Sequence, residues 1–489
     1  MLRLVRSVKN NIAPINRIPP ELFSLIPQHW NDDSVDENLI AMTHVCHGWR
    51  DVLIGCPLLW TRLNCADRNK TRVYIERSKS SPLEVHLREY ETPRYCLGPF
   101  IMALSHIDRV DSLIVKGRET LRGDLTECDF SRSISLRNLS IDFECRTPPT
   151  LDSRIFNGDL SSLERLSLSG VIPNLPWRNL PKLTSFKLRN VPREETSVTR
   201  LLNFFANAPL LDSIELLYAM PETSDASPGR VVSLPSLKNF AICAGPIHSS
   251  SLLDHLSIPA GALLHLRFHF RGEDSPLPQV LPKTSENLKN THHFTSAYLK
   301  FTSGSFSVRF NGPSGELHMY GSGRNQLGMS PERRILQSLD YFGLSRIQNL
   351  AVATYESPGF KETDMSPPYN ILHAMKDLRT LFLNRCNNLP FILALDPAQT
   401  PLDHILCPKL EELILYVGHK ETVNSLELVN MAKERSLRGA KLHSIVLASP
   451  GKILWEWVVL RLREHVVRVE RRTWGSVPEW DSIPNDGSN

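Results

Sequence analysis

The apolar positions of this chain follow one repeated spacing over most of its length. From about residue 81, an apolar residue is followed three positions later by a second one, and two positions after that by a third. Eleven such triples occur at intervals of mostly 20 to 32 residues, among them Leu163-Leu166-Leu168 and Leu410-Leu413-Leu415. The last two members of a triple lie two apart, so they point to the same side of a short strand. The pattern therefore predicts many short strands stacked side by side and running parallel.

Other periodicities interrupt this spacing. Residues 294–320 alternate apolar and polar positions between the turn signals Ser303-Gly304 and Asn311-Gly312, which predicts a three-stranded β-meander. Helical spacing predicts helices over 369–375 and 426–434 and a capping element over 452–469. Segments rich in Pro, Gly and Ser predict loops at 221–230, 271–285 and 356–368.

Residues 14–63 form a separate, predominantly helical module. Pro19-Pro20-Glu21 starts a short helix that Pro27 ends, and apolar residues stepping by three and four from Leu39 to Leu53 predict one longer helix. About 50 residues are too few to bury all of this apolar surface internally, so the module is expected to need a partner. Around it we expect a tail at 1–13, a connector helix at 64–80, the repeat body at 81–472 and a polar tail at 473–489.

Composition and charge narrow the function classes. The chain of 489 residues has 41% hydrophobic residues and a net charge of +4, which is too balanced for a nucleic-acid groove. Nine cysteines, odd in number and without a C-x-x-C pair, indicate a reducing compartment, the cytoplasm or the nucleus. No apolar stretch approaches the ~20 residues of a membrane span, so we expect no membrane partner.

The usual catalytic motifs are absent from the sequence. There is no H-E-x-x-H, no G-x-S-x-G and no phosphate-binding glycine loop. His44 and His47 share a helix face from which Cys46 points away, and His265 and His269 lie ~13 Å apart along a strand, so neither set predicts a metal site. We expect a binding protein with no catalytic residue, no metal and no cofactor.

The residue between the paired positions of each triple faces outward from the sheet. In the C-terminal half these residues are apolar, which predicts a target-binding groove formed by Phe382, Ile414 and Val446 and rimmed by Asn384 and Tyr416. The alternative is that a loop or the tryptophan-bearing C-terminal tail covers this stripe.

Three short sequence motifs within residues 14–63 resemble an F-box. They are Ile18-Pro19-Pro20-Glu21-Leu22, Val45-Cys46-His47-Gly48-Trp49-Arg50 and Pro57-Leu58-Leu59-Trp60. The sequences of these motifs are most similar to those of the F-box-like proteins expanded in mushroom-forming fungi. Three departures from the family pattern are Ile18 in place of leucine, a longer loop at 28–36 and Gly48 inside the second helix. The triples that follow resemble an irregular leucine-rich-repeat solenoid.

These resemblances imply an α/β protein: a helical F-box module, then a repeat solenoid with a curved parallel sheet and a β-meander. They imply a substrate-recognition subunit of a Skp–cullin–F-box ubiquitin ligase, without catalytic activity of its own. The solenoid would bind an unknown protein target. The family's adaptor contacts carry over to seven positions, Pro19, Glu21, Leu22, Ile26, Val45, Cys46 and Trp49. The alternatives are a plain helical cap, a leucine-rich-repeat scaffold with no link to ubiquitin, and an enzyme whose site is assembled from distant residues.

Overall fold

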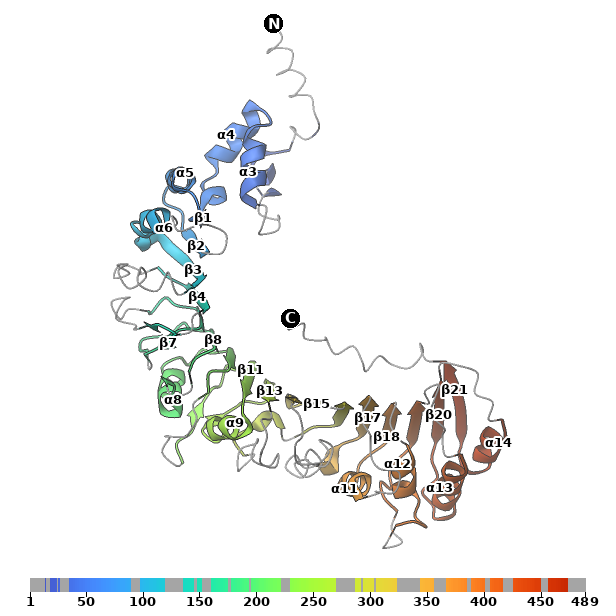
Figure 1. The fold of residues 1–489 in the computed structure, drawn as a ribbon. Coiled ribbons are helices and arrows are strands. Elements are labelled where there is room, and N and C mark those ends of the chain that lie inside the picture. Colours follow the sequence, from blue (N-terminus) through green and yellow to red (C-terminus); the bar gives the residue numbers. More distant parts are fainter. Residues whose placement is uncertain are drawn as a thin grey trace. The chain divides into compact units, whose positions relative to one another are not determined.

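The computed structural model describes most of the chain, in two compact units. The described residues are 14, 18–23, 25–26, 35–88, 97–118, 135–144, 147–151, 160–174, 177–192, 195–220, 229–269, 286–291, 293–302, 305–322, 344–355, 366–384, 388–400, 405–416, 425–449 and 456–473. The first unit comprises residues 1–196 and 203–211, and the second comprises 197–202 and 212–489. Figure 1 gives the labels of the helices and strands.

Six parallel strands build the first unit, and we call them the first array. In spatial order they are β1 (Arg62–Asn64), β2 (Leu83–Arg88), β3 (Val110–Arg118), β4 (Asn138–Glu144), β6 (Arg165–Ser169) and β8 (Ser185–Arg189). The predicted connector helix is α5 (Arg68–Ser78), which joins β1 to β2. The parallel pairing therefore starts at Arg62, ahead of the first apolar triple. Further elements are α6 (Leu97–Leu104), η5 (Ile107–Arg109) and the two-residue pair β5 (Thr150–Leu151) and β7 (Ile172–Pro173).

The N-terminal module forms short helices that we call the head. They are α2 (Pro20–Phe23), α3 (Val35–Thr43), α4 (His47–Gly55) and the 3-10 turn η3 (Pro57–Trp60). The prediction of one helix from Leu39 to Leu53 is wrong, because the chain turns between Thr43 and Cys46.

Eleven strands build the second unit, and we call them the second array. In spatial order they are β9 (Ser213–Leu217), β11 (Asn239–Ala244), β13 (Leu263–His269), β16 (Gly315–Ser322), β15 (Ser305–Gly312), β14 (Ser296–Thr302), β17 (Asn349–Tyr355), β18 (Thr380–Asn384), β19 (Glu412–Tyr416), β20 (Ser444–Ser449) and β21 (Arg468–Thr473). Every neighbouring pair is parallel except the two pairs that β15 forms. The predicted meander is confirmed as β14–β16, and it enters the array in reverse order. Its second turn lies at Pro313-Ser314, two residues later than expected.

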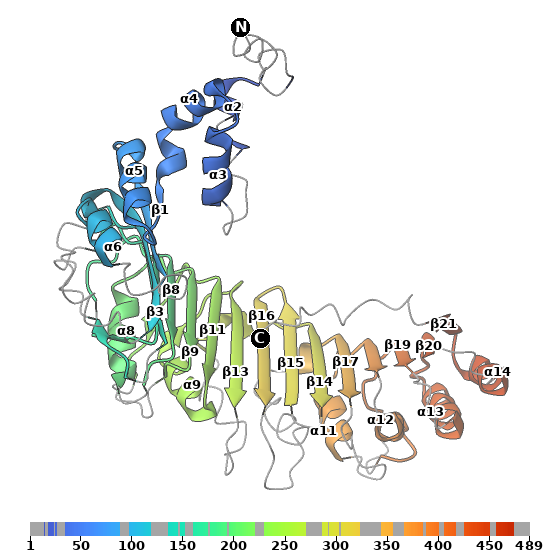
Figure 2. The same cartoon turned by 45° about the horizontal axis from the view of Figure 1, so that its top comes forward.

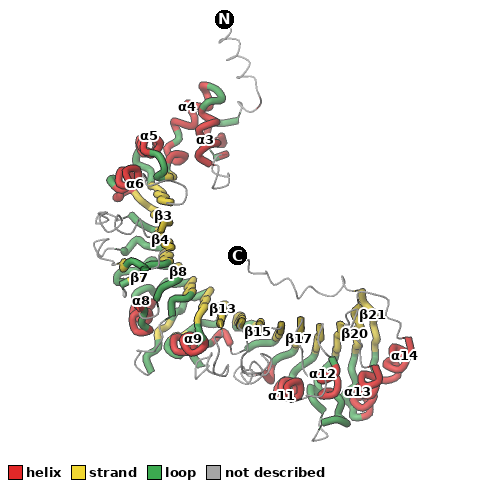
Figure 3. Tube along the Cα trace, viewed as in Figure 1, coloured by secondary structure: helices red, strands yellow, loops and turns green. Residues whose placement is uncertain are grey.

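Helices connect the strands and gather on one face of each array (Figures 1 and 3). They are α8 (Val198–Ala206), α9 (Pro246–Leu253), α11 (Ser366–Ala374), α12 (Leu389–Leu395), α13 (Ser425–Leu437) and α14 (Glu456–His465), with the 3-10 turns η10 (Lys289–Thr291) and η12 (Leu344–Arg346). β10 (Val232–Ser233) and β12 (Leu256–Ser257) form a separate pair. The helices predicted at 369–375 and 426–434 are confirmed as α11 and α13. The described part of the capping element predicted over 452–469 contains α14 and the start of β21, which adds a last strand to the array.

The apolar triples form the core between strands and helices. The second and third residues of all eleven triples are buried, apart from the half-buried Leu447. Their side chains alternate along each strand with side chains on the opposite face, which carries none of the described helices. The fold is mixed α/β with a mostly parallel sheet, as the sequence predicts. Two predicted bounds are corrected: Thr473, predicted as the start of the C-terminal tail, ends β21, and residues 366–368, predicted as loop, begin α11. The predictions for the tails at 1–13 and over the rest of 473–489, for 271–285, for the turn at Ser303-Gly304 and for most of 221–230 and 356–368 lie outside the described residues.

Candidate protein-interaction surfaces

A compact core of its own holds the head together. Leu39, Leu53 and Trp60 are fully buried. The Trp60 indole Nε1 donates to the Leu53 carbonyl at 2.9 Å, and its ring meets Tyr74 of α5 edge-on with centroids 5.0 Å apart. The Arg77 guanidinium lies over the same ring, 4.3 Å from its centroid, in a cation–π contact. The last of the three motifs, Pro57–Trp60, thus anchors the head on α5, which lies beside the head in Figures 1 and 2.

The turn between α3 and α4 has a local cause. His44 N and Val45 N bond carbonyls three residues back, which tightens the end of α3. Cys46 is extended at φ −155° and ψ 171°, and its Sγ accepts from Trp49 N, so it caps α4. Gly48 is the second residue of α4, so it lies in the first turn and not in the helix interior, where a glycine is most destabilising.

The seven residues predicted to contact the adaptor divide by exposure. Leu22 and Val45 keep 56% and 58% of their surface exposed, and Pro19 and Glu21 are exposed as well. The other three, Ile26, Cys46 and Trp49, are half-buried. Trp49 therefore contributes partly to the head's own packing.

Three further apolar side chains of the head are exposed, and sequence reasoning did not single them out. These are Leu25, Ile40 and Leu58, at 43%, 38% and 61% exposed. Helical spacing places Ile40 next to the buried Leu39, so periodicity alone does not separate the two roles. Fifteen large hydrophobic residues are exposed in the described part of the chain, and five of them fall between Leu22 and Leu58.

The second array continues one row of side chains across its helix-free face. The strand register aligns Glu215, Ala241, His265, His318, Arg309, Tyr298, Ala351, Phe382, Ile414 and Val446 in this order. The row is polar over β13, β16 and β15 and apolar from β14 onward. The sequence predicts the apolar stretch but not its neighbours, since the reversed meander decides which strand lies next to β17.

The predicted open groove is wrong at four of its five residues. Phe382 and Val446 keep 5% and 0% of their surface exposed, Asn384 and Tyr416 are buried too, and only Ile414 stays half-buried. Phe382 and Tyr416 belong to one cluster with Tyr298, Ala351, Ala353 and Ala448, and Ile414 packs against it. Because small side chains alternate with aromatic ones in neighbouring strands, the rings fill the space that a groove would need.

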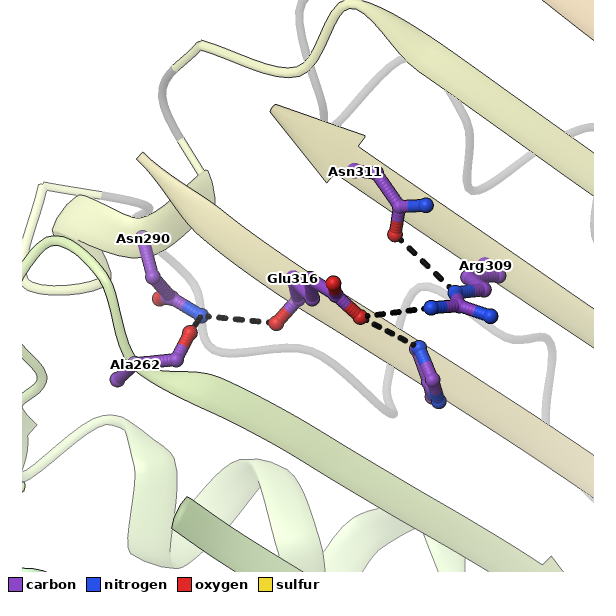
Figure 4. A network of polar contacts seen from close by, with 6 residues as sticks. Ala262, Asn290, Arg309, Asn311 and Glu316 are labelled. Atoms are coloured by element: carbon purple, nitrogen blue, oxygen red, sulfur yellow. Dashed lines mark hydrogen bonds and ion pairs between the residues drawn. The ribbon is translucent and has the colours of Figure 1, made fainter. Parts of the chain in front are cut away.

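The polar part of the row is a network of fixed side chains (Figure 4). The Arg309 guanidinium donates to Asn311 Oδ1 at 3.2 Å and to Glu316 Oε2 at 3.1 Å. The same carboxylate oxygen pairs with His318 Nε2 at 3.1 Å, and the His318 ring meets His265 edge-on, with centroids 4.6 Å apart. Burial, with smaller contributions from His265 and Arg309, lowers the pKa of His318 to about 4, so this imidazole is neutral near pH 7.

Asn290 fixes the start of β16 below this network. Its side chain is fully buried, and its Nδ2 donates to the carbonyls of Ala262 and Glu316 at 3.3 and 3.5 Å. The backbone of Glu316 is thereby held against β13, and its carboxylate is left to face Arg309 and His318. The orientation of Arg309 is therefore set by the fold on both sides.

The described residues also bear on metal binding, disulfides and membrane-spanning helices. Within the described residues, no group of three or more His, Cys, Asp or Glu side chains is arranged to hold a metal ion. His47 pairs instead with Asp51 at 2.8 Å on the exposed side of α4. The cysteines whose side chains are described, Cys46, Cys56, Cys65, Cys243 and Cys407, are free thiols. None of the described helices is long and apolar enough to cross a membrane.

Comparison with known proteins adds no family or relative. No protein-family model matches the chain, and no curated protein matches it either.

Proposed function

We propose that this chain is the substrate-recognition subunit of a Skp–cullin–F-box ubiquitin ligase of the cytoplasm or nucleus. In this proposal the head is an F-box, and the two arrays are an irregular leucine-rich-repeat solenoid that holds the target. One observation carries the proposal. The head exposes Leu22 and Val45, which come from two of the three F-box-like motifs, while Trp60 from the third motif is buried in its core.

The burial pattern of the head supports docking on a second protein. One third of the exposed large hydrophobic residues in the described chain lie in the head, although the head is a small part of it. Such a concentration of apolar surface is typical of an interaction site, since scattered single residues are the norm elsewhere. A plain helical cap would have no need for these side chains to face outward.

The size of the docking energy follows from the exposure. Burying a whole leucine or valine side chain stabilises by about 1.5–3 kcal/mol, and slightly more than half of Leu22 and Val45 remains to be buried. Each residue thus offers roughly 1 kcal/mol, or about fivefold in affinity. Five exposed apolar residues together suit an adaptor interface with an aliphatic centre.

The chain would contribute to ubiquitin transfer by proximity alone. Holding a target beside a charged ubiquitin carrier raises the effective concentration of its lysines, which needs no catalytic residue in this subunit. The adaptor and, through it, a cullin would be its partners at the head.

Co-purification with a Skp-family adaptor tests the proposal. We expect the wild-type chain to retain the adaptor, and Pro19→Ser with Leu22→Asp, or Val45→Asp alone, to lower its recovery at least about tenfold. Leu460→Asp is the matched control, because Leu460 on α14 is 61% exposed and undergoes the same chemical change. Equal recovery from all variants would favour the alternative, a repeat scaffold with no link to ubiquitin.

A further inference from the structure

Four neighbouring strands of the second array carry excess positive charge on their helix-free face. The described side chains that alternate to this face from β13, β16, β15 and β14 include Arg267, Arg309 and Lys300, against one carboxylate, Glu316. Among these described side chains, three cations and one anion give a formal net charge of +2 without counting the histidines. We call this surface the basic face.

Two cations of the basic face, Arg267 and Lys300, mark the ends of a line across the strands. The register pairs Arg267 with Tyr320, Tyr320 with Ser307, and Ser307 with Lys300, so three strand spacings separate the two ends. At ~4.8 Å per spacing this is roughly 14 Å, and Arg309 on β15 lies beside this line, two residues from Ser307. One phosphate group is much smaller than this line. An extended peptide covers it with about four residues at ~3.3 Å each.

The central cation is already oriented. Two of the Arg309 nitrogens, Nε and Nη2, are engaged by Asn311 and Glu316, and Nη1 stays outside this network. A guanidinium held in this way loses little rotamer freedom when it meets a carboxylate, which favours binding.

Exposed aromatic rings accompany the cations. Tyr320 on β16 and Tyr218 directly after β9 are 42% and 54% exposed. Tyr218 is tied to this surface, since its backbone N donates to Cys243 O at 2.9 Å and Cys243 is paired in register with Arg267. Tyrosines at such positions supply contact area at low entropic cost.

We propose that the basic face binds an extended, carboxylate-rich segment of the target protein, which crosses β13, β16, β15 and β14 with acidic residues about four positions apart at Arg267 and Lys300. The charge and the length of the surface select this partner. The inference rests on the proposed function only for the partner's identity as a ligase target.

Fluorescence anisotropy of the full-length chain with a fluorescein-labelled octaglutamate peptide tests the inference. We expect binding of octaglutamate, none of an octaglutamine peptide at the same concentration, and about tenfold weaker binding for Arg267→Gln with Lys300→Gln. Lys300→Gln alone should weaken binding about threefold, and it is the second variant should the double one unfold. Melting temperatures of all variants confirm that they are folded.

A matched double variant distinguishes binding at a defined site from nonspecific electrostatic attraction. Lys116→Gln with Lys187→Gln removes the same charge from the helix-free face of the first array and should leave octaglutamate binding unchanged. Equal weakening by this pair, or equal binding of octaglutamine, would overturn the inference. Tighter binding of a peptide that carries one phosphoserine and no other charged side chain would also overturn the inference. No adaptor is present in this assay, so failure here leaves the adaptor experiment untouched, and the reverse also holds.

Discussion

Gly315 links the fold of the meander to the basic face, and its replacement by alanine should be costly. Gly315 opens β16 with a φ of +131°, a region that L-residues rarely adopt. A Cβ there would lie 2.6 Å from the Ala262 carbonyl oxygen and 3.1 Å from the Asn290 Cβ. Both neighbours belong to the contact that holds β16 against β13, so relief of the clash must move that contact.

The cost can be worked from these contacts. An unfavourable φ costs about 1–2 kcal/mol by itself. Moving the Ala262 carbonyl also weakens its bonds with Asn290 Nδ2 and with Glu316 N, at about 1 kcal/mol each. The sum for Gly315→Ala is about 3–4 kcal/mol. Gly439→Ala is the control, since Gly439 has a φ of +82° but no atom within 4 Å of a new Cβ, and should cost about 1–2 kcal/mol.

Urea unfolding followed by tryptophan fluorescence and circular dichroism measures both variants. We expect the free energy of unfolding to fall about 2 kcal/mol further for Gly315→Ala than for Gly439→Ala, with the difference set by the Ala262 contact. Octaglutamate binding should weaken in Gly315→Ala alone, because Glu316 and therefore Arg309 shift. Equal losses of stability in the two variants would refute this reasoning about β16.

Three other predictions concern single side chains. Arg435 is fully buried and donates to the Leu406 and Cys407 carbonyls at 2.7 and 3.0 Å. Burial lowers the Arg435 pKa to about 10, so the side chain is still charged near pH 7. Arg435→Ala should lower the free energy of urea unfolding by about 3–5 kcal/mol. Trp60→Phe removes the bond to Leu53 O and should destabilise the head by about 1–2 kcal/mol, measured by hydrogen exchange of α4 amides. The pKa of His318 is lowered from 6.5 to about 4, so its contribution to stability is complete above pH 6.5 and is lost as pH falls toward 4; His318→Gln should flatten the unfolding free energy over this range.

The sequence was most informative where one period dominates. The apolar triples and the alternation over 294–320 predict strands correctly, because each strand buries one face and the period of two shows which one. It failed between α3 and α4, where Leu39, Met42, Cys46 and Trp49 keep helical spacing across a turn. The break depends on the extended backbone of Cys46, and apolar periodicity carries no signal for that.

The candidate surfaces depend on pairings that sequence order hides. Tyr298 faces Ala351, and His265 faces His318, only because the meander enters the array reversed, with β16 next to β13 and β14 next to β17. In direct order, neither the closed aromatic cluster nor the basic face would form with its present members. The exposure of Leu22 and Val45 depends likewise on how the head packs.

Adaptor binding by the head is the central claim, and titration calorimetry of the full-length chain with a purified Skp-family adaptor at two temperatures tests it most directly. We expect a one-to-one complex whose binding enthalpy becomes more negative on warming, because apolar surface around Leu22 and Val45 is buried. Leu460→Asp should leave this signal intact, and Val45→Asp should remove most of it. No binding by the wild-type chain, or binding that Val45→Asp leaves unchanged, would contradict the account.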